Sequence, residues 1–201
     1  MNASEVTLTN YPDSPLPSKG QLHLLFKRSD PNNAMLYDEG NALRYYLATS
    51  DAFSKVKIRD EAQKVVVEVN RRAFLRDVFV LPNRNDGKPV KVADVLKQAA
   101  TTSTGQLSWA LHTEQGTYYW RRKRSELHWA LYEPSSTAAV AWTETVSGTP
   151  PTWELVLESR ALHVLDYVLA ALFYLKAAPD NSEAGKAWEI VDSRVAALVT
   201  K

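Results

Sequence analysis

Hydrophobic and polar residues alternate with a period of two through most of this chain. Leu22, Leu24 and Phe26 alternate with other residues near the start of the pattern, and residues 153–158 close it. About eleven short segments of this kind occur, separated by turn-type sequences such as Glu114-Gln115-Gly116. Closely spaced strands joined by tight turns predict antiparallel meanders.

The segment Ala161–Ala178 breaks this pattern, because it is apolar on nearly every side of a helix. A helix packed on one face of a sheet carries a polar stripe, so we predict that this helix is surrounded by strands. A closed barrel would also remove exposed strand edges. The alternative is a membrane span, but the helix would reach only ~27 Å and contains His163, Asp166 and Lys176. A buried helix is therefore the favoured interpretation.

The predicted fold class is mainly β with α, a closed antiparallel barrel around a central C-terminal helix. Residues 1–20 form an extended N-terminal arm, and residues 21–178 form the barrel domain with its central helix over 161–178. A short helix is expected where Val92, Val95, Leu96 and Ala99 recur at helical spacing, and residues 181–201 form an extra amphipathic helix.

Composition narrows the classes of protein. Of the 201 residues 45% are hydrophobic, and the net charge is +1, which excludes a disordered chain and argues against a nucleic-acid partner. The chain has no cysteine, which excludes disulfide scaffolds and thiolate metal sites. The polar N-terminus lacks the apolar run of a signal peptide, so a cytoplasmic protein is expected.

Three features together resemble the tubby C-terminal-like superfamily, which includes the phospholipid scramblases and the LURP-one-related proteins. They are the order of strands, the unit Glu114–Arg121 followed by a hairpin into Leu127-His128-Trp129, and the terminal helix that begins at Leu162. The chain is most similar in style to single-domain fungal members, over roughly residues 20–178. The resemblance implies a closed barrel of about twelve strands around the helix.

Tubby proteins bind phosphoinositides through cations on the barrel surface, but no residue-by-residue match carries that role over to this chain. Scramblase features are missing, because there is neither a Cys-rich palmitoylation stretch nor a clear acidic Ca²⁺ loop. The tail from residue 181 onward also lies outside the superfamily's usual pattern.

Two cationic segments are the candidate ligand-binding residues. The run Arg121, Arg122, Lys123 and Arg124 follows aromatic residues at a strand end, and Lys55, Lys57 and Arg59 share one face of another strand. Either cluster would attract phosphate-bearing headgroups. The alternative is ordinary solvation of a turn and a strand face, and whether the two segments form one patch is open.

Candidate chemistry is sparse. His163 and Asp166 lie three apart on one helix face, which fits either a buried acid–base pair or a structural pair at a helix N-terminus, and the structural interpretation is favoured. No nucleophile elbow, zinc-protease or phosphate-loop motif occurs, and no metal-ligand spacing or cofactor site is predicted. The tryptophans are interpreted as core and rim packing, apart from the peripheral Trp188.

We therefore expect a non-enzymatic binding module that is cytoplasmic or peripheral at a membrane, with a phosphoinositide or an anionic membrane surface as ligand. The first alternative is a protein-interaction or structural adaptor that docks through Trp188, Val191 and Val195 of the last helix. The second is an enzyme whose site is assembled only in three dimensions.

Overall fold

A computed structural model of the chain describes residues 20–30, 33–50, 54–72, 75–99, 107–122, 128–146 and 152–176. Most of the predicted arm over 1–20 lies outside these residues, and so does the predicted helix over 181–201 with Trp188, Val191 and Val195. Those predictions therefore stay predictions.

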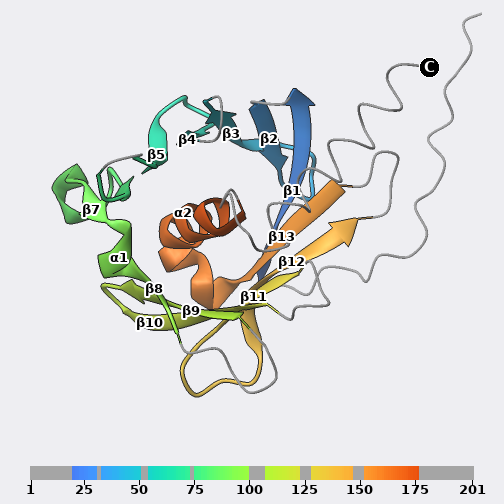
Figure 1. The fold of residues 1–201 in the computed structure, drawn as a ribbon. Helices are drawn as coiled ribbons and strands as arrows, with labels where there is room; N and C mark the ends of the chain where they lie inside the picture. The colour runs from blue at the N-terminus through green and yellow to red at the C-terminus, as the bar shows by residue number, and fades with distance from the viewer. Residues whose placement is uncertain are drawn as a thin grey trace, which may run out of the picture.

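The described residues form thirteen strands in one antiparallel sheet, which curls around a helix near the end of the chain (Figure 1). The strands are β1 (Gln21–Asp30), β2 (Asn33–Tyr37), β3 (Leu43–Thr49), β4 (Lys55–Asp60), β5 (Val65–Asn70), β6 (Val78–Val80), β7 (Val90–Lys91), β8 (Leu96–Gln98), β9 (Leu107–Thr113), β10 (Gly116–Arg122), β11 (Trp129–Tyr132), β12 (Ala139–Val146) and β13 (Thr152–Glu158). The helical elements are η2 (Asn85–Gly87), α1 (Val92–Val95), η3 (Ser159–Val164) and α2 (Leu165–Lys176).

Within the described residues, hydrogen bonds do not close the sheet into a barrel. Its order is β7-β6-β5-β4-β3-β2-β1-β13-β12-β11-β10-β9-β8, so β7 and β8 are the two edges. In sequence these edges are separated only by the four residues of α1, and this short helix takes the place of a further ladder. The prediction of about twelve strands in a hydrogen-bonded barrel is corrected to thirteen strands with a helical connection between the edges.

The C-terminal helix lies inside the curl of the sheet, as its sequence predicted (Figure 1). Both Leu169 and Leu172 are almost fully buried, and of the residues in α2 only Leu165, Asp166, Tyr174 and Lys176 are partly exposed. Burying a leucine side chain contributes about 1.5–3 kcal/mol. The predicted start at residue 161 is corrected, because residues 159–164 form the 3₁₀ segment η3 before the α-helix begins.

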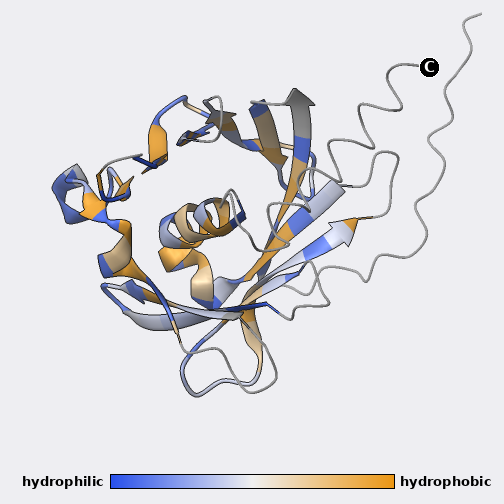
Figure 2. Cartoon of the chain, viewed as in Figure 1, coloured by the Kyte–Doolittle hydropathy of each residue, from blue (hydrophilic) through white to orange (hydrophobic). Residues whose placement is uncertain are grey.

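The strands supply the other side of this core through alternate residues. Buried side chains of the inner face include Leu24, Ile58, Leu111, Trp120, Leu131 and Leu157. In Figure 2 the hydrophobic colour follows the helix and parts of the surrounding strands. The period-two prediction is thereby confirmed for these strands.

The predicted short helix near residue 92 is wrong in its length. Only Val92–Val95 is helical, and Leu96 instead pairs with Leu111 in the ladder between β8 and β9. Val92 and Val95 still face the core, because both side chains are buried. Four residues provide the helical turn, and the strand pairing of Leu96 ends it.

Candidate functional site

The N-terminal end of α2 is fixed by an ion pair. Nε of Arg84 lies 2.7 Å from Oδ2 of Asp166, and the same guanidinium donates to the carbonyl oxygen of His163 at 2.5 Å. Oδ1 of Asp166 accepts the backbone N–H of Tyr167 at 3.0 Å, close to the positive end of the helix dipole. The hydrogen bond with Asp166 raises the pKa of Arg84 further, so this guanidinium is charged at every physiological pH.

The His163 side chain has a different partner. Its Nε2 atom lies 3.3 Å from the hydroxyl of Tyr118, and no hydrogen bond joins the side chains of His163 and Asp166. The structural interpretation of the pair is the one that this geometry supports. Nothing in the sequence pointed to Arg84, which is 82 positions from Asp166.

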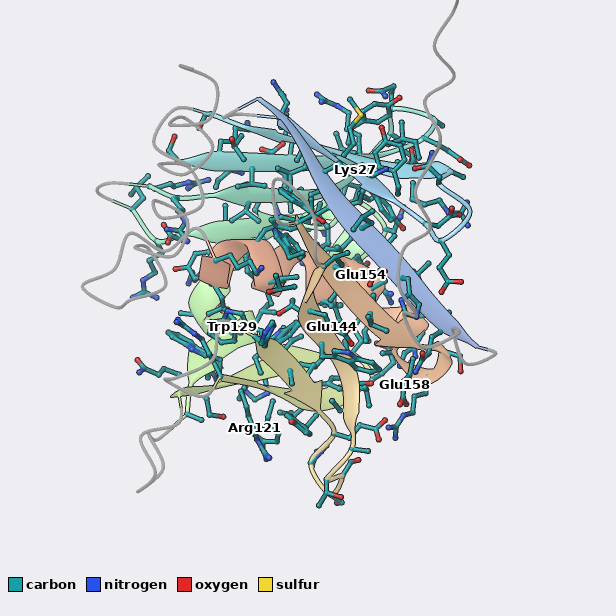
Figure 3. All side chains as sticks on the ribbon, turned by 90° about the vertical axis from the view of Figure 1, so that its right-hand side faces the viewer. Lys27, Arg121, Trp129, Glu144, Glu154 and Glu158 are labelled. Atoms are coloured by element: carbon teal, nitrogen blue, oxygen red, sulfur yellow. The ribbon has the colours of Figure 1, made fainter. Side chains whose placement is uncertain are left out.

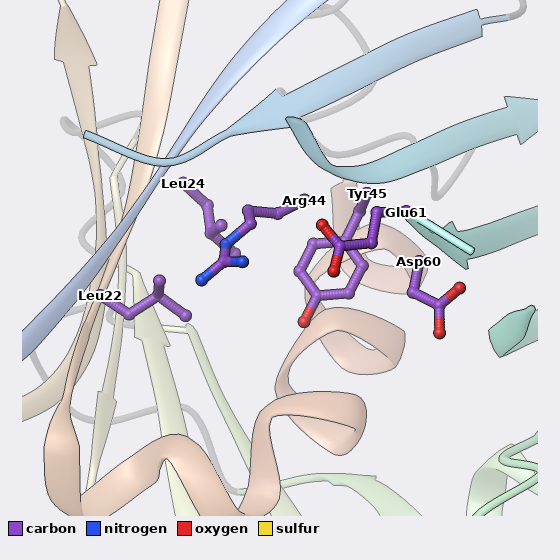
Figure 4. Close-up of a pocket in the computed structure, with 6 residues that line it drawn as sticks. All are labelled: Leu22, Leu24, Arg44, Tyr45, Asp60 and Glu61. Atoms are coloured by element: carbon purple, nitrogen blue, oxygen red, sulfur yellow. The ribbon is translucent and has the colours of Figure 1, made fainter. Parts of the chain in front are cut away.

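A pocket of about 260 Å³ opens beside this end of the helix (Figure 4). It is lined by Leu22, Leu24, Arg44, Tyr45, Asp60 and Glu61. Burial raises the pKa of Tyr45, and the negative charges of Asp60 and Glu61 add to the effect while Arg44 opposes it. The phenol therefore stays protonated at neutral pH, and the two carboxylates Asp60 and Glu61 share the lining with it.

The described residues contain neither a metal-binding cluster nor a membrane-spanning helix. No group of three or more histidine, aspartate or glutamate side chains among them could hold a metal ion. Within the same ranges, no helix is long and apolar enough to cross a bilayer.

The predicted cations of β4 lie among acid partners. Nζ of Lys55 is 2.9 Å from Oε1 of Glu68, and Nζ of Lys57 is 3.3 Å from Oε2. Burial opposes ionisation of Glu68, but hydrogen bonds from Asn70, Lys55 and Lys57 outweigh it and lower the pKa of the carboxyl. Arg59 lies opposite Tyr46 and Val65, without a carboxylate opposite it in either neighbouring strand.

The predicted run at the end of β10 divides between the two faces of the sheet. Arg121 lies 4.7 Å above the ring of Tyr132, whereas Arg122 is only 4% exposed and lies 5.8 Å from the ring of Trp129. Neighbouring residues of a strand point to opposite faces, which explains the division. Lys123 and Arg124 lie outside the described residues.

The two cationic segments do not merge. Six strands separate β4 from β10 in the order of the sheet. Strands β4 and β10 lie on opposite sides of α2 (Figure 1). Arg121 and the cations of β4 are therefore separate features of the surface.

Cations from distant parts of the sequence gather at the C-terminal end of α2. Nζ of Lys176 lies 3.6 Å from the centre of the Trp153 ring, and burial together with the charge of Arg122 lowers the pKa of Lys176 to about 7. The guanidinium of Arg71 donates to the carbonyl oxygen of Tyr174 and stacks 4.6 Å from its ring. Cations are favourable at the negative end of a helix dipole.

The outer face of β1 and β13 carries a different cluster. Nδ1 of His23 lies 3.1 Å from Glu154, and Nε2 lies 3.3 Å from Glu39. Burial raises the pKa of Glu154, and His23 opposes that effect. Glu144 pairs in register with Glu154, and Figure 3 labels both carboxylates on neighbouring strands.

Comparison with known proteins gives a family and a distant fold match. The family model described as "Family of unknown function (DUF6593)" matches residues 29–178. No curated protein sequence matches the chain significantly. A solved structure of a protein from Arabidopsis thaliana matches with a TM-score of 0.42 and 12% sequence identity, over 76% of this chain and 91% of that one.

Proposed function

The chain belongs to the family of unknown function DUF6593, and we propose that it is a non-enzymatic module that binds anionic phospholipid surfaces. The observation that carries this proposal is the segregation of charge between the two ends of α2. We call them the basic end, around the last turn of the helix, and the acidic end, around its first turn.

The basic end is rich in arginine and lysine. Arg71, Arg122 and Lys176 surround the last turn of α2, and Arg72 and Arg76 are exposed in the connection that follows β5. Described cations there include Lys55, Arg71, Arg72, Arg76 and Arg121, together with Arg122, which is buried, and Lys176, whose pKa is lowered to about 7, and the acids beside them include Glu68 and Asp77.

The acidic end has the opposite balance. It contains the turns after β2, β4, β9 and β11 and the segment η3, which all lie near the first turn of α2. The acids there include Asp38, Glu39, Asp60, Glu61, Asp86, Glu114, Glu133, Glu158 and Asp166, against cations that include Arg44, Lys64, Arg84, Lys88 and Arg160. Several of these cations are already paired, as Arg44 is with Asp38 at 3.1 Å.

A protein with this polarity is oriented by an anionic membrane. Each lysine or arginine near such a surface contributes about 1 kcal/mol, and the acidic end is repelled from it. The net charge of +1 gives no sign of this polarity, because a net charge does not report where the charges lie. The acids Glu144 and Glu154 on β12 and β13 limit the positive region on that side of the molecule.

The resemblance to the tubby-like superfamily supports the same proposal, since tubby proteins bind phosphoinositides through surface cations. In this proposal the curled sheet acts as the barrel of that superfamily, with α1 bridging its two edges, and the protein is peripheral at a cytoplasmic membrane surface.

Vesicle co-sedimentation tests the proposal. We expect binding to phosphatidylcholine vesicles with about 30% phosphatidylserine or a few per cent phosphoinositide, little binding to phosphatidylcholine alone, and weakening as salt rises from about 0.1 to 0.5 M. The double change Arg72→Ser and Arg76→Ser should weaken binding roughly 10- to 30-fold.

The matched control removes two charges at the other end of the molecule. Lys64 and Lys88 are both exposed, and changing both to Ser alters the net charge by the same amount. We expect this variant to bind as the parent chain does. Equal losses for the two double variants, or parent binding that ignores lipid charge, would remove the proposal.

A further inference from the structure

Leu75 is the most exposed large hydrophobic side chain among the described residues. It is 68% exposed, and the other large hydrophobic residue exposed within the described ranges is Leu162, at 41% in η3. Single exposed leucines are common, so exposure alone assigns no role. The surroundings of Leu75 give it one.

The connection that carries Leu75 is held firmly at its base. The backbone N–H of Arg72 donates to Oδ1 of Asp77 at 2.9 Å, and the hydroxyl of Tyr174 donates to Oδ2 at 2.9 Å. Arg71 is bound to the carbonyl oxygen of the same Tyr174. Both sides of the connection are therefore fixed to the last turn of α2.

Exposed cations flank the leucine. Arg72 and Arg76 are exposed, and no ion pair within the described residues involves either of them. Asp77, the acid at the base of the connection, already accepts hydrogen bonds from a backbone N–H and from Tyr174. Among the described residues of this connection, an exposed leucine thus lies between two exposed arginines.

We propose that Leu75, flanked by Arg72 and Arg76, enters an anionic lipid bilayer, with the two arginines at the headgroup level and the leucine among the first acyl carbons. This inference rests on the proposed function, and it adds the identity of the inserting residue and the orientation of the protein on the bilayer. In this orientation the basic end faces the bilayer. The last turn of α2 is then the end of the helix nearer the membrane, and its first turn is the end farther away. An apolar side chain between cations matches the layering of an anionic membrane, in which negative headgroups cover hydrocarbon.

Leu162 provides the contrast. It lies in η3 at the acidic end, next to the segment that carries Glu158 and close in sequence to Asp166. An anionic surface repels these carboxylates, so an exposed leucine at that end stays in water when the protein binds.

A single-cysteine label tests the inference directly, because the natural chain contains no cysteine. Leu75→Cys and, as the matched control, Leu162→Cys are labelled with an environment-sensitive nitrobenzoxadiazole probe and mixed with phosphatidylcholine–phosphatidylserine vesicles. The probe at position 75 should shift its emission to shorter wavelength and be quenched by spin-labelled acyl chains. The probe at position 162 should do neither.

A second variant measures how much insertion adds to binding. Leu75→Ser should weaken binding to the same vesicles roughly 5- to 10-fold while leaving the salt dependence unchanged, because the removed contact is apolar. The paired Arg72→Ser and Arg76→Ser changes should reduce the salt dependence itself.

The outcomes separate the inference from the proposed function. If the protein binds anionic vesicles but the probe at position 75 stays in water, or both probes shift, the inserting residue and the orientation are wrong while lipid binding stands. If the parent chain does not bind anionic vesicles at all, the proposed function and this inference both fall.

Discussion

Nζ of Lys176 lies 3.6 Å from the centre of the Trp153 ring, at the last turn of the buried helix. The ring offers the ammonium a cation–π contact, but burial and the charge of Arg122 still lower the pKa of Lys176 to about 7. A charged lysine is therefore costly to the fold at this place.

This cost predicts how stability depends on pH. The unfolded chain keeps the ordinary lysine pKa of 10.5, so between about pH 7 and 10.5 it binds more protons at Lys176 than the folded chain does. The contribution of Lys176 to the free energy of unfolding accordingly rises with pH across that window. Lys176→Met should be more stable than the parent by roughly 1–3 kcal/mol near pH 6, with the difference shrinking towards pH 10.

Urea denaturation at a series of pH values checks this prediction. Lys88→Met is the control, because Lys88 is exposed at the opposite end, and it should show no such trend. A difference between Lys176→Met and the parent that is constant with pH would mean that Lys176 titrates in the folded protein as an ordinary lysine.

The pair of Arg84 and Asp166 should stabilise the start of α2. Both side chains are mostly buried, 20% and 14% exposed, and Asp166 also accepts the N–H of Tyr167. We expect Asp166→Ala and Arg84→Ala each to cost about 1.5–3 kcal/mol, with a coupling of about 1–2 kcal/mol in a double-mutant cycle. The exposed pair Arg160 and Glu133 should couple more weakly, and equal coupling in both cycles would contradict this assignment.

Glu154 should make stability fall as pH rises. Its pKa is raised in the folded state, so the folded chain holds the proton above the ordinary value of 4.5, where the unfolded chain loses it. The stabilisation is complete below pH 4.5 and is lost as pH passes the folded pKa. Glu154→Gln should therefore be more stable than the parent by roughly 0.5–1 kcal/mol at pH 7, and should lose this advantage near pH 4.

Thermal unfolding of Glu154→Gln beside Glu144→Gln isolates the effect of burial. Glu144 is the register partner of Glu154 but is exposed. A gain at pH 7 for Glu144→Gln equal to that for Glu154→Gln would point to simple relief of repulsion between the two carboxylates instead of burial.

The buried helix should dominate stability. Leu172 is fully buried in α2, and truncating it leaves a cavity in the centre of the curled sheet. Leu172→Ala should cost about 3–5 kcal/mol, whereas Leu162→Ala in the exposed part of η3 should cost well under 1 kcal/mol. Denaturant midpoints give both values, and similar losses would mean that α2 is not the centre of the core.

Alternation and apolar content predicted the strands and the buried helix because both signals are local. The alternation along β10 also accounts for the burial of Arg122. Tyr118 and Trp120 are buried, and Arg122 is the next residue on the same face of the strand. The prediction of a single cationic cluster over residues 121–124 did not take this alternation into account.

Other features depend on contacts that no local pattern reports. Arg84 meets Asp166 across 82 positions, and Arg71 meets Tyr174 across 103. The pairing of Leu96 with Leu111 ended a helix whose spacing alone would have continued it to Ala99. The segregation of charge between the two ends likewise follows from the strand order, which assembles distant turns.

Hydrogen–deuterium exchange of the parent chain, with and without phosphatidylserine-containing vesicles, tests most directly which end meets the membrane. The account predicts that vesicles slow exchange at the basic end, around Arg72, Arg76 and Tyr174, and leave exchange at the acidic end, around Asn85 and Glu114, unchanged. Protection at the acidic end, or equal protection at both ends, would contradict it.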